Sequence, residues 1–275
     1  MGLAWPVRNP PDDESCDTRI CRTGDGRRSN IGRVLVGVSL ASSAVGVWAG
    51  PPFQTDDPEP VGLHHYEFYV ATQQTLTSGG RTGTLPHFEF NYGAAPEVQL
   101  HVIAPVAFND PAGETRQRGY GDTELGVKYR FVQESDNTPM VGVFPIYLAP
   151  TGNSDRGLGN GSYQLFLPVW LQKSWGKWTT YGGGGYWINH ASGTKNNWFF
   201  GWLVQRELSE QWTLGAELFY RTEQLAGQGE SSGFSIGGSF NPSEHHHALF
   251  SIGKGLQNAA DTNKFSSYLG YQLTY

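Results

Sequence analysis

The sequence predicts an all-β protein, a closed antiparallel transmembrane β-barrel of about 12 strands connected as an up-and-down meander. Three observations predict it. Apolar and polar residues alternate with period two over runs of about 10–13 residues, which is long for soluble strands but sufficient for a tilted strand to cross a membrane. Tight turns alternate with longer polar loops between these runs. Glycine and aromatic residues are abundant (37 Gly, 13% aromatic), whereas only 16% of residues are charged.

Composition also excludes several classes of protein. The formal net charge of -6 leaves no basic face for nucleic acid, so no nucleic-acid partner is expected. Abundant aromatic residues and few charges argue against intrinsic disorder. No stretch reaches the roughly 20 apolar residues of a membrane-spanning helix.

The first 49 residues do not fit the barrel pattern. Residues 1–28 are polar and without periodicity, which suggests that translation starts downstream of Met1. Residues 29–49 have a basic start, a short apolar run and small residues at the end, the pattern of a signal peptide cleaved after Ala49. Both cysteines, Cys16 and Cys21, precede that cleavage site, so the mature chain is expected to contain no disulfide.

Residues 64–275 are expected to form the barrel, and residues 50–63 a periplasmic segment or plug. In each predicted strand the residues alternate between a face toward lipid and a face toward the lumen. The predicted strands are 64–76, 86–95, 97–108, 121–133, 140–149, 162–174, 177–189, 197–208, 211–223, 232–241, 246–256 and 264–275.

The connections indicate how the barrel is oriented. Tight turns follow the even-numbered strands and longer loops follow the odd-numbered ones, as in barrels with periplasmic turns and extracellular loops. The long loops include 77–85, 109–121 and 150–161. An even number of strands places both ends of the barrel in the periplasm.

Aromatic residues are expected to form two interfacial girdles. Those near the tight turns are Trp175, Trp178 and Trp212, with Tyr271 or Tyr275. Those near the long loops are Tyr120, Tyr163, Tyr186, Trp187 and Trp198. The last strand ends on the aromatic Tyr275, which resembles the C-terminal signal read by the barrel-assembly machinery.

Two features interrupt the strand pattern. Prolines within predicted strands, at positions 105, 145 and 168, remove backbone donors and favour bulges or edges. A run of four glycines, 182–185, indicates a kink or a wall that something packs against closely, such as a plug.

Charged residues on the polar strand faces are the candidate lumen-lining residues. They could tune the selectivity of a pore, or pair with one another and fill the lumen, and the sequence leaves both open. The principal candidates are Glu67, Glu89, His101, Glu124, Lys128, Arg130, Glu217 and Arg221. Glu97, Arg206 and Lys254 are further candidates.

The acidic stretch before the barrel is the candidate plug. Its carboxylates Asp56, Asp57 and Glu59 could enter the periplasmic mouth and meet Lys128 or Arg130, or the stretch could be a linker. No cofactor is expected. No metal site is expected either, since the consecutive histidines 245–247 point to alternate strand faces. No catalytic residue is identified, because no G-x-S-x-G motif occurs.

Several motifs resemble one family, the outer-membrane barrels grouped with the phenol meta-pathway degradation proteins. They are PPFQTDDPEP (51–60), GYGDTELGVKYRF (119–131), APTG (149–152), GLG (157–159), QKSWG (172–176) and TTYGGGGYWIN (179–189). The resemblance covers about residues 50–275 and implies an outer-membrane transporter. No catalytic residue follows from it.

The sequence therefore favours an outer-membrane barrel that is a passive channel or uptake porin for small compounds, aromatic or hydrophobic ones included. Its expected partners are the outer-membrane bilayer, a small-molecule solute and the barrel-assembly machinery. The alternatives are a barrel enzyme of esterase or acyl-transfer type and a structural barrel without transport.

Overall fold

A computed structural model describes residues 51–191 and 193–275 of the chain. The N-terminal extension 1–28, the signal peptide 29–49 and both cysteines lie outside the described residues. In the described part, no helix is long and apolar enough to cross a membrane.

The described residues form one antiparallel sheet of fourteen strand segments, which make up twelve barrel strands. Two barrel strands are each divided into two segments, β4 with β5 and β6 with β7. The segments are β1 (Tyr66–Thr77), β2 (Gly80–Ala95), β3 (Val98–Pro111), β4 (Gln117–Tyr120), β5 (Thr123–Val132), β6 (Met140–Val143), β7 (Ile146–Ala149), β8 (Gln164–Trp175), β9 (Trp178–Asn189), β10 (Asn197–Glu207), β11 (Trp212–Arg221), β12 (Ser231–Phe240), β13 (His246–Gln257) and β14 (Phe265–Thr274). A short 3-10 helix, η1 (Ser154–Arg156), and a one-turn helix, α1 (Ala259–Thr262), lie in two of the loops.

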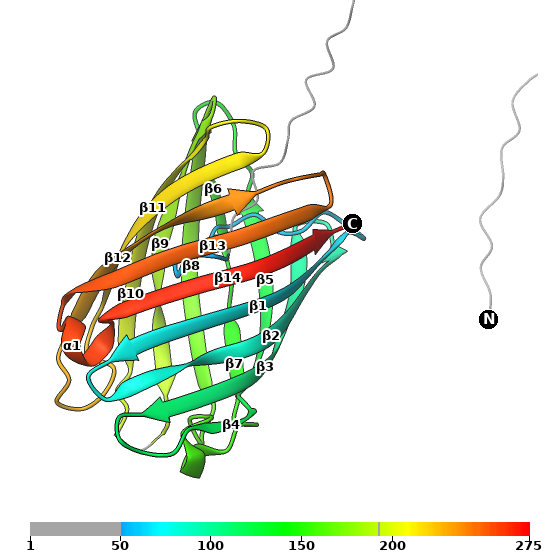
Figure 1. Ribbon diagram of the computed structural model, residues 1–275. Helices are drawn as coiled ribbons and strands as arrows, with labels where there is room; N and C mark the ends of the chain where they lie inside the picture. The colour runs from blue at the N-terminus through cyan, green and yellow to red at the C-terminus, as the bar shows by residue number, and fades with distance from the viewer. Residues whose placement is uncertain (1–50, 192) are drawn as a thin grey trace, which may run out of the picture. The chain divides into compact units, whose positions relative to one another are not determined.

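The sheet closes on itself, as the sequence predicts. β1 pairs with β2 on one side and with β14 on the other (Figure 1). At the seam, the backbone N–H of Tyr66 donates to the carbonyl of Tyr275, and that of Tyr275 donates back to Tyr66, at 2.6 and 2.9 Å. Closure pairs the backbone groups that an open edge would expose to lipid.

Proline and loop contacts explain the divided strands. The β6–β7 strand breaks at Phe144-Pro145, because proline has no N–H for the ladder. Opposite Pro105 of β3, the register with β2 shifts between Thr84 and His87. The β4–β5 strand breaks at residues 121–122, where the Asp122 carboxylate accepts the backbone N–H groups of Gly152 and Asn160 from the β7–β8 loop.

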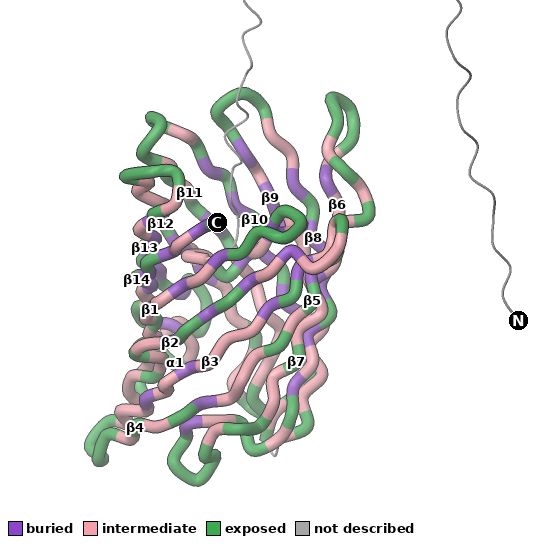
Figure 2. Tube along the Cα trace, turned by 90° about the vertical axis from the view of Figure 1, so that its right-hand side faces the viewer, coloured by how far each residue is buried: buried purple, intermediate pink, exposed green. Residues whose placement is uncertain are grey.

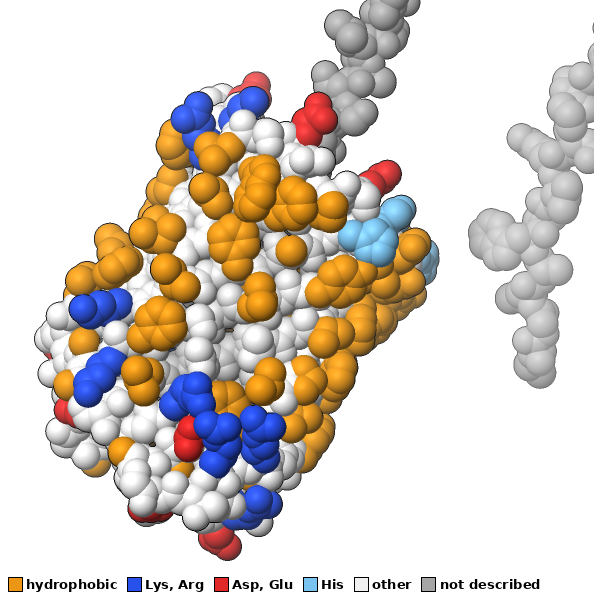
Figure 3. Space-filling view, viewed as in Figure 1, with side chains coloured by type: hydrophobic (Ala, Val, Ile, Leu, Met, Phe, Trp, Pro, Cys, Tyr) orange, Lys and Arg blue, Asp and Glu red, His pale blue; other side chains and the backbone are white. Residues whose placement is uncertain are grey.

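Burial follows the predicted alternation (Figure 2). On β5, Leu125, Val127 and Tyr129 are 43–45% exposed on the outer face, while Lys128 is 3% exposed inside. The outer wall is largely apolar (Figure 3), as a lipid-facing surface must be.

The strands extend further toward the long-loop end than the periodicity indicates. Residues 80–85, expected in a loop, belong to β2, and residues 80–84 pair with β1 and leave only a two-residue turn. Residues 109–111 and 117–120 likewise form strand beyond the predicted boundaries. Backbone pairing continues there without a lipid-facing apolar stripe, so the hydrophobic pattern does not reveal it.

The glycine run of β9 accommodates rings from the neighbouring strands. A Cβ on Gly182 would lie 2.4 Å from the Trp202 ring, and one on Gly185 would lie 2.7 Å from the Phe166 ring. The segment 51–62 packs instead against Gly201 of β10, where a Cβ would lie 2.1 Å from the Thr55 hydroxyl. The close packing expected here therefore comes from the wall itself, and the N-terminal segment lies one strand away.

Most predicted girdle residues face outward, with Trp175, Trp178 and Trp198 each about half exposed (58, 47 and 47%). Trp187 was expected in the girdle near the long loops, and that prediction is wrong. Its ring stacks on the buried Phe166 ring at 4.6 Å, inside the barrel, because its strand position faces the lumen.

Candidate functional site

Residues 51–62, here called the inner segment, lie within the barrel interior. Thr55 and Asp57 are fully buried, and Pro58 lies within 3.1 Å of the point where a Cβ on Gly142 of β6 would be. The Ser251 hydroxyl of β13 donates to the Pro52 carbonyl at 2.6 Å. The segment therefore contacts opposite sides of the barrel.

Glu217 of β11 holds the start of the inner segment. Its carboxylate accepts the backbone N–H groups of Gln54 and Thr55 at 3.1 and 2.9 Å, and the Thr55 hydroxyl at 2.8 Å. Glu217 is 2% exposed. Hydrogen bonds to a charged acceptor are stronger than neutral ones, so this carboxylate is a strong anchor for otherwise unpaired backbone donors.

Two basic side chains of β5 meet the acidic part of the inner segment. The Lys128 Nζ lies 3.0 Å from Asp56 Oδ1 and 3.5 Å from Asp57 Oδ2, and Arg130 Nη1 lies 3.8 Å from Glu59 Oε1. Burial raises the pKa of the Asp57 carboxyl well above its usual range, against the opposing effect of Lys128. Burial also raises the pKa of Glu59, although Arg130 opposes it.

Polar side chains from two other strands complete the attachment. The Gln99 side chain of β3 accepts the Val61 N–H at 2.9 Å, and Gln172 Nε2 of β8 donates to Glu59 at 3.3 Å. The inner segment is thus tied to β3, β5, β8, β11 and β13.

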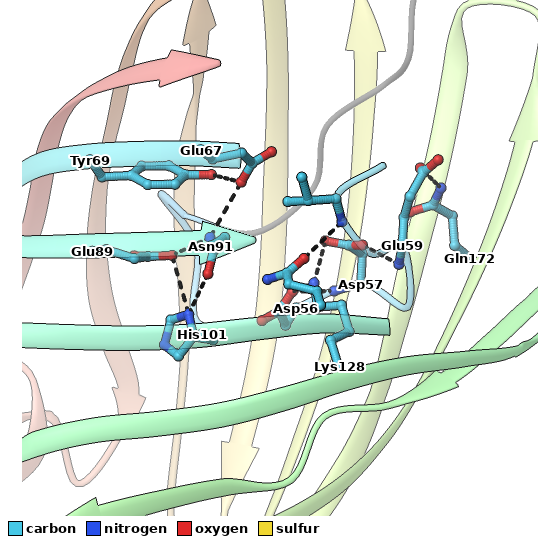
Figure 4. Close-up of polar contacts among 12 residues, drawn as sticks. Asp56, Asp57, Glu59, Glu67, Tyr69, Glu89, Asn91, His101, Lys128 and Gln172 are labelled. Carbon is cyan, nitrogen blue, oxygen red and sulfur yellow. Dashed lines mark hydrogen bonds and ion pairs between the residues drawn. The ribbon is translucent and has the colours of Figure 1, made fainter. Parts of the chain in front are cut away.

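Carboxylates and their partners line one side of the interior, here called the polar wall. It comprises Glu67, Tyr69, Glu89, Asn91, His101 and Glu124, on β1, β2, β3 and β5. Figure 4 shows the β1–β3 members pointing toward one another. Asn91 Nδ2 donates to both Glu67 and Glu89. His101 lies between Glu89 and Glu124, with nitrogen–oxygen distances of 3.6 and 3.0 Å.

Aromatic rings cover the facing side, here called the aromatic wall. Phe166 and Trp170 of β8 pack against Phe199 of β10, with ring centroids 6.3–6.4 Å apart. The members are Phe144, Phe166, Trp170, Trp187, Phe199 and Phe219. Edge-to-face and offset contacts of this kind stabilise a cluster beyond the area that it buries.

A cavity of about 410 Å³ lies between the inner segment and the two walls. Polar-wall residues and Lys128 border it on one side, and the rings of Phe144, Phe166, Trp170 and Trp187 border it on the other. Among the described residues, no group of three or more His, Cys, Asp or Glu is arranged to hold a metal ion.

Comparison with known proteins places the chain in a family. The family described as "Putative MetA-pathway of phenol degradation" matches residues 69–273. The chain belongs to this family. A search of curated proteins finds no match.

Solved structures similar to this family member are barrels of outer membranes. An outer-membrane channel from Pseudomonas putida F1 matches with a TM-score of 0.66 at 15% identity, over 80% of this chain and 98% of that one. The NanC porin matches with a TM-score of 0.53 at 8% identity, over 76% and 98% of the two chains. The KdgM porin matches with a TM-score of 0.50 at 8% identity, over 75% and 99%. At these identities the likeness shows the fold, a transmembrane β-barrel of the outer-membrane type.

Most of the lumen-lining and plug candidates identified from the sequence lie close together in the structure. Glu67, Glu89, His101, Glu124, Lys128 and Arg130, with Asp56 and Glu59, line the cavity. Asp57 and Glu217 lie behind it, bound within the inner segment's contacts. Arg221 lies apart, with its guanidinium 5.2 Å from the Phe199 ring and bonded to Gln224.

Three further candidates do not line the cavity. Arg206 faces outward, 5.1 Å from the Trp178 ring, and Lys254 is exposed between the outward-facing Ile252 and Leu256. Glu97 lies in the β2–β3 turn, where it pairs with Arg130. The prediction that Arg206 and Lys254 line the lumen is wrong, because their strand positions alternate with the buried Gln205 and Gly255.

The lumen-lining candidates identified from the sequence include no residue of the aromatic wall. The sequence pattern that could have identified this wall is in β8, where Phe166 and Trp170 share a face with Gln164 and Gln172. The other face consists of Leu165, Leu167, Val169 and Leu171. A purely aliphatic face marks the lipid side, so the aromatic residues alternating with it face the lumen.

Proposed function

We propose that this protein is a passive outer-membrane channel for small compounds with an aromatic or other apolar body. The observation that carries the proposal is the cavity of about 410 Å³ against the aromatic wall. Its size falls within the range of small-molecule sites, and such sites are mostly apolar with a few convergent polar groups. Four aromatic rings border this cavity, and those of Phe144, Phe166 and Trp170 are buried, which a lumen for ions alone does not need.

The two walls together support this choice of solute class. Phe166 and Trp187 offer flat apolar surfaces, and the carboxylates of Glu67 and Glu89 across the cavity accept hydrogen bonds. A ring that carries one hydroxyl or other hydrogen-bond donor meets both requirements. The family description, which refers to phenol degradation, agrees with such a solute.

The inner segment is the plug of this channel. Its contacts are ion pairs and hydrogen bonds, with Lys128 and Glu217 as the principal anchors, and water can replace such contacts when the segment moves. A solute that crosses the barrel therefore requires the segment to shift within the lumen or leave it.

The remaining parts of the proposal concern location. The similar channel and porins belong to outer membranes, and the outward aromatic and apolar belt fits that setting. Export follows from the signal peptide at residues 29–49, and insertion from recognition of the last strand, ending at Tyr275, by the barrel-assembly machinery.

Single-channel recording in planar bilayers tests the proposal. We expect a small conductance for the full barrel, and a larger one when residues 54–59 are replaced by a glycine–serine stretch of equal length. Benzyl alcohol should interrupt the current of the full barrel at concentrations at which an aliphatic polyol of similar size has no effect.

A variant of the aromatic wall provides the matched control. Phe166→Ala should abolish the benzyl alcohol effect while the barrel still shows heat-modifiable migration on a gel. The proposal of a channel is wrong if neither chain conducts, and the proposed solute class is wrong if the full barrel conducts but benzyl alcohol does not interrupt its current. Hydrolysis of a chromogenic ester by the same preparation would favour the enzyme alternative instead.

A further inference from the structure

A group of basic side chains lies on the outer wall at the long-loop end of the barrel. It comprises Arg81 of β2, Arg116 in the loop before β4 and Arg118 of β4, and is here called the basic rim. Figure 3 shows Lys and Arg side chains gathered below the apolar surface on this side of the molecule. The apolar face ends where the cationic groups begin.

Strand register places Arg81 and Arg118 on the lipid-facing side. Arg81 pairs with Leu76, and Leu76 pairs with Phe265, and the latter two are each 40% exposed. Arg118 alternates with Gly119, where a Cβ would meet the Leu158 side chain of an inward-folded loop. Directly opposite residues of an antiparallel pair point to the same side, so Arg81 shares the outer face with Leu76 and Phe265.

One carboxylate holds two of the arginines in place. Asp110 Oδ2 lies 3.2 Å from Arg81 Nη2 and 2.5 Å from Arg116 Nη2. The Arg81 guanidinium is also 5.7 Å from the Phe108 ring. Arg81 and Arg116 keep 39% and 42% of their side-chain surface exposed, so each has donors left for another anion.

A groove of about 580 Å³ runs along the wall beside the rim. Leu76 and Phe265 supply apolar surface, and Arg81 with Asp110 borders its polar edge. Glu114 also borders the groove, so the rim and the groove together hold three arginines and two carboxylates, those of Asp110 and Glu114, and are positive in balance. The groove thus has an apolar floor beside a cationic edge.

We propose that the basic rim and this groove bind a phosphate-bearing lipid of the outer leaflet, of the lipid A type. Long loops mark the extracellular end of such barrels, so the rim lies where acyl chains meet headgroups. Guanidinium groups match phosphate geometry in a bidentate manner. The phosphate contacts Arg81, Arg116 and Arg118, and an acyl chain lies along Leu76 and Phe265.

This binding is separate from solute passage through the lumen. The rim is on the outer wall, and none of its side chains borders the cavity inside the barrel. The bound lipid would seal the β1–β3 surface against the outer leaflet.

Native mass spectrometry of the full barrel in detergent micelles tests the proposal, with bisphosphorylated hexa-acyl lipid A as the probe. The double variant Arg81→Gln, Arg118→Gln should bind about 25-fold more weakly, at about fivefold for each cation near a charged lipid surface. Arg118→Gln alone should weaken binding about fivefold, which provides a second variant that leaves the ion pairs of Asp110 with Arg81 and Arg116 intact.

Arg206→Gln is the matched control, because Arg206 is an outward arginine that packs on Trp178 near the β8–β9 turn at the opposite end. It should bind the probe within twofold of the unaltered protein. The proposal is overturned if the rim variants bind as the control does, or if fully dephosphorylated lipid A binds equally well. Displacement of the probe by millimolar inorganic phosphate would also overturn it, because the site would then be one for the free anion.

Discussion

The two walls of the barrel interior are built from different interactions. The aromatic wall is a packed set of rings, in which Phe166, Trp170 and Phe199 are at most 5% exposed. The polar wall is a network in which Glu67, Glu89 and His101 are also buried, at 3–7% exposure, but are joined by hydrogen bonds and charge. The two walls are therefore similarly buried but are stabilised by different interactions.

The difference shows what each wall contributes. Ring packing depends on shape and loses energy when volume is removed, whereas the polar network depends on which groups are ionised. The inner segment is tied mainly to charged groups, Lys128 and Glu217, and not to the rings. Barrel stability should therefore come chiefly from the aromatic wall, and retention of the segment from charge.

Removing a ring from the aromatic wall should have the largest effect. Trp170→Ala leaves a void beside Phe166 and Phe199, and should lower the free energy of unfolding by about 3–5 kcal/mol. Urea titration of the barrel folded in lipid vesicles, followed by gel mobility, measures the loss. Trp202→Ala is the control on the lipid face, where Trp202 is 51% exposed. Equal losses in the two variants would contradict the proposed role of the inner ring cluster.

Removing the cation that meets the inner segment should have the next largest effect. Lys128→Met leaves Asp57, which is fully buried, without its basic partner, and should weaken retention of the segment by about 3 kcal/mol. Conductance in planar bilayers should rise as the segment leaves, with little change in unfolding by urea. Lys195→Met is the matched control, since Lys195 pairs with Glu223 at the long-loop end and makes no contact with the segment. An unchanged conductance in Lys128→Met would show that charge does not retain the segment.

The smallest effect should come from pH. Burial raises the pKa of both Asp57 and Glu59 when the segment is inside the barrel, and release into water returns both to about 4. A raised folded-state pKa favours the inserted segment below about pH 4, and this contribution is lost as the pH rises through the raised values. Conductance should therefore be lower at pH 4.5 than at pH 7.5. A pH dependence that persists in Asp57→Asn, Glu59→Gln would assign it to other groups.

Period-two alternation predicted most of the fold because lipid admits few exceptions. Each outward residue must be apolar, so Leu125, Val127 and Tyr129 identify the outer face and Lys128 the inner one. The same rule failed near the ends of strands. Residues 80–85 form strand without an apolar stripe, and Arg206 and Lys254 lie on the outer face despite their charge. Long basic side chains reach the interface from such positions.

Only part of the candidate site could be predicted from the sequence. Strand alternation selected side chains such as Glu89 and Glu217 for the interior, but it assigns no partner across the lumen. The contact between Glu217 and Thr55 joins residues 162 positions apart. Trp187 was assigned to the wrong surface, because aromatic content near a loop predicts a girdle as readily as a ring packed inside.

The sequence by itself determined that the chain closes into a lipid-facing barrel of twelve strands, because backbone groups in a membrane must pair and outward side chains must be apolar. Tertiary structure alone decided what fills that barrel. The inner segment meets Lys128 and Glu217, and the aromatic wall faces the polar wall, because closure of the sheet brings distant strands to opposite sides of one lumen. Those distances across the lumen depend on strand order and register around the whole barrel, which no local pattern encodes.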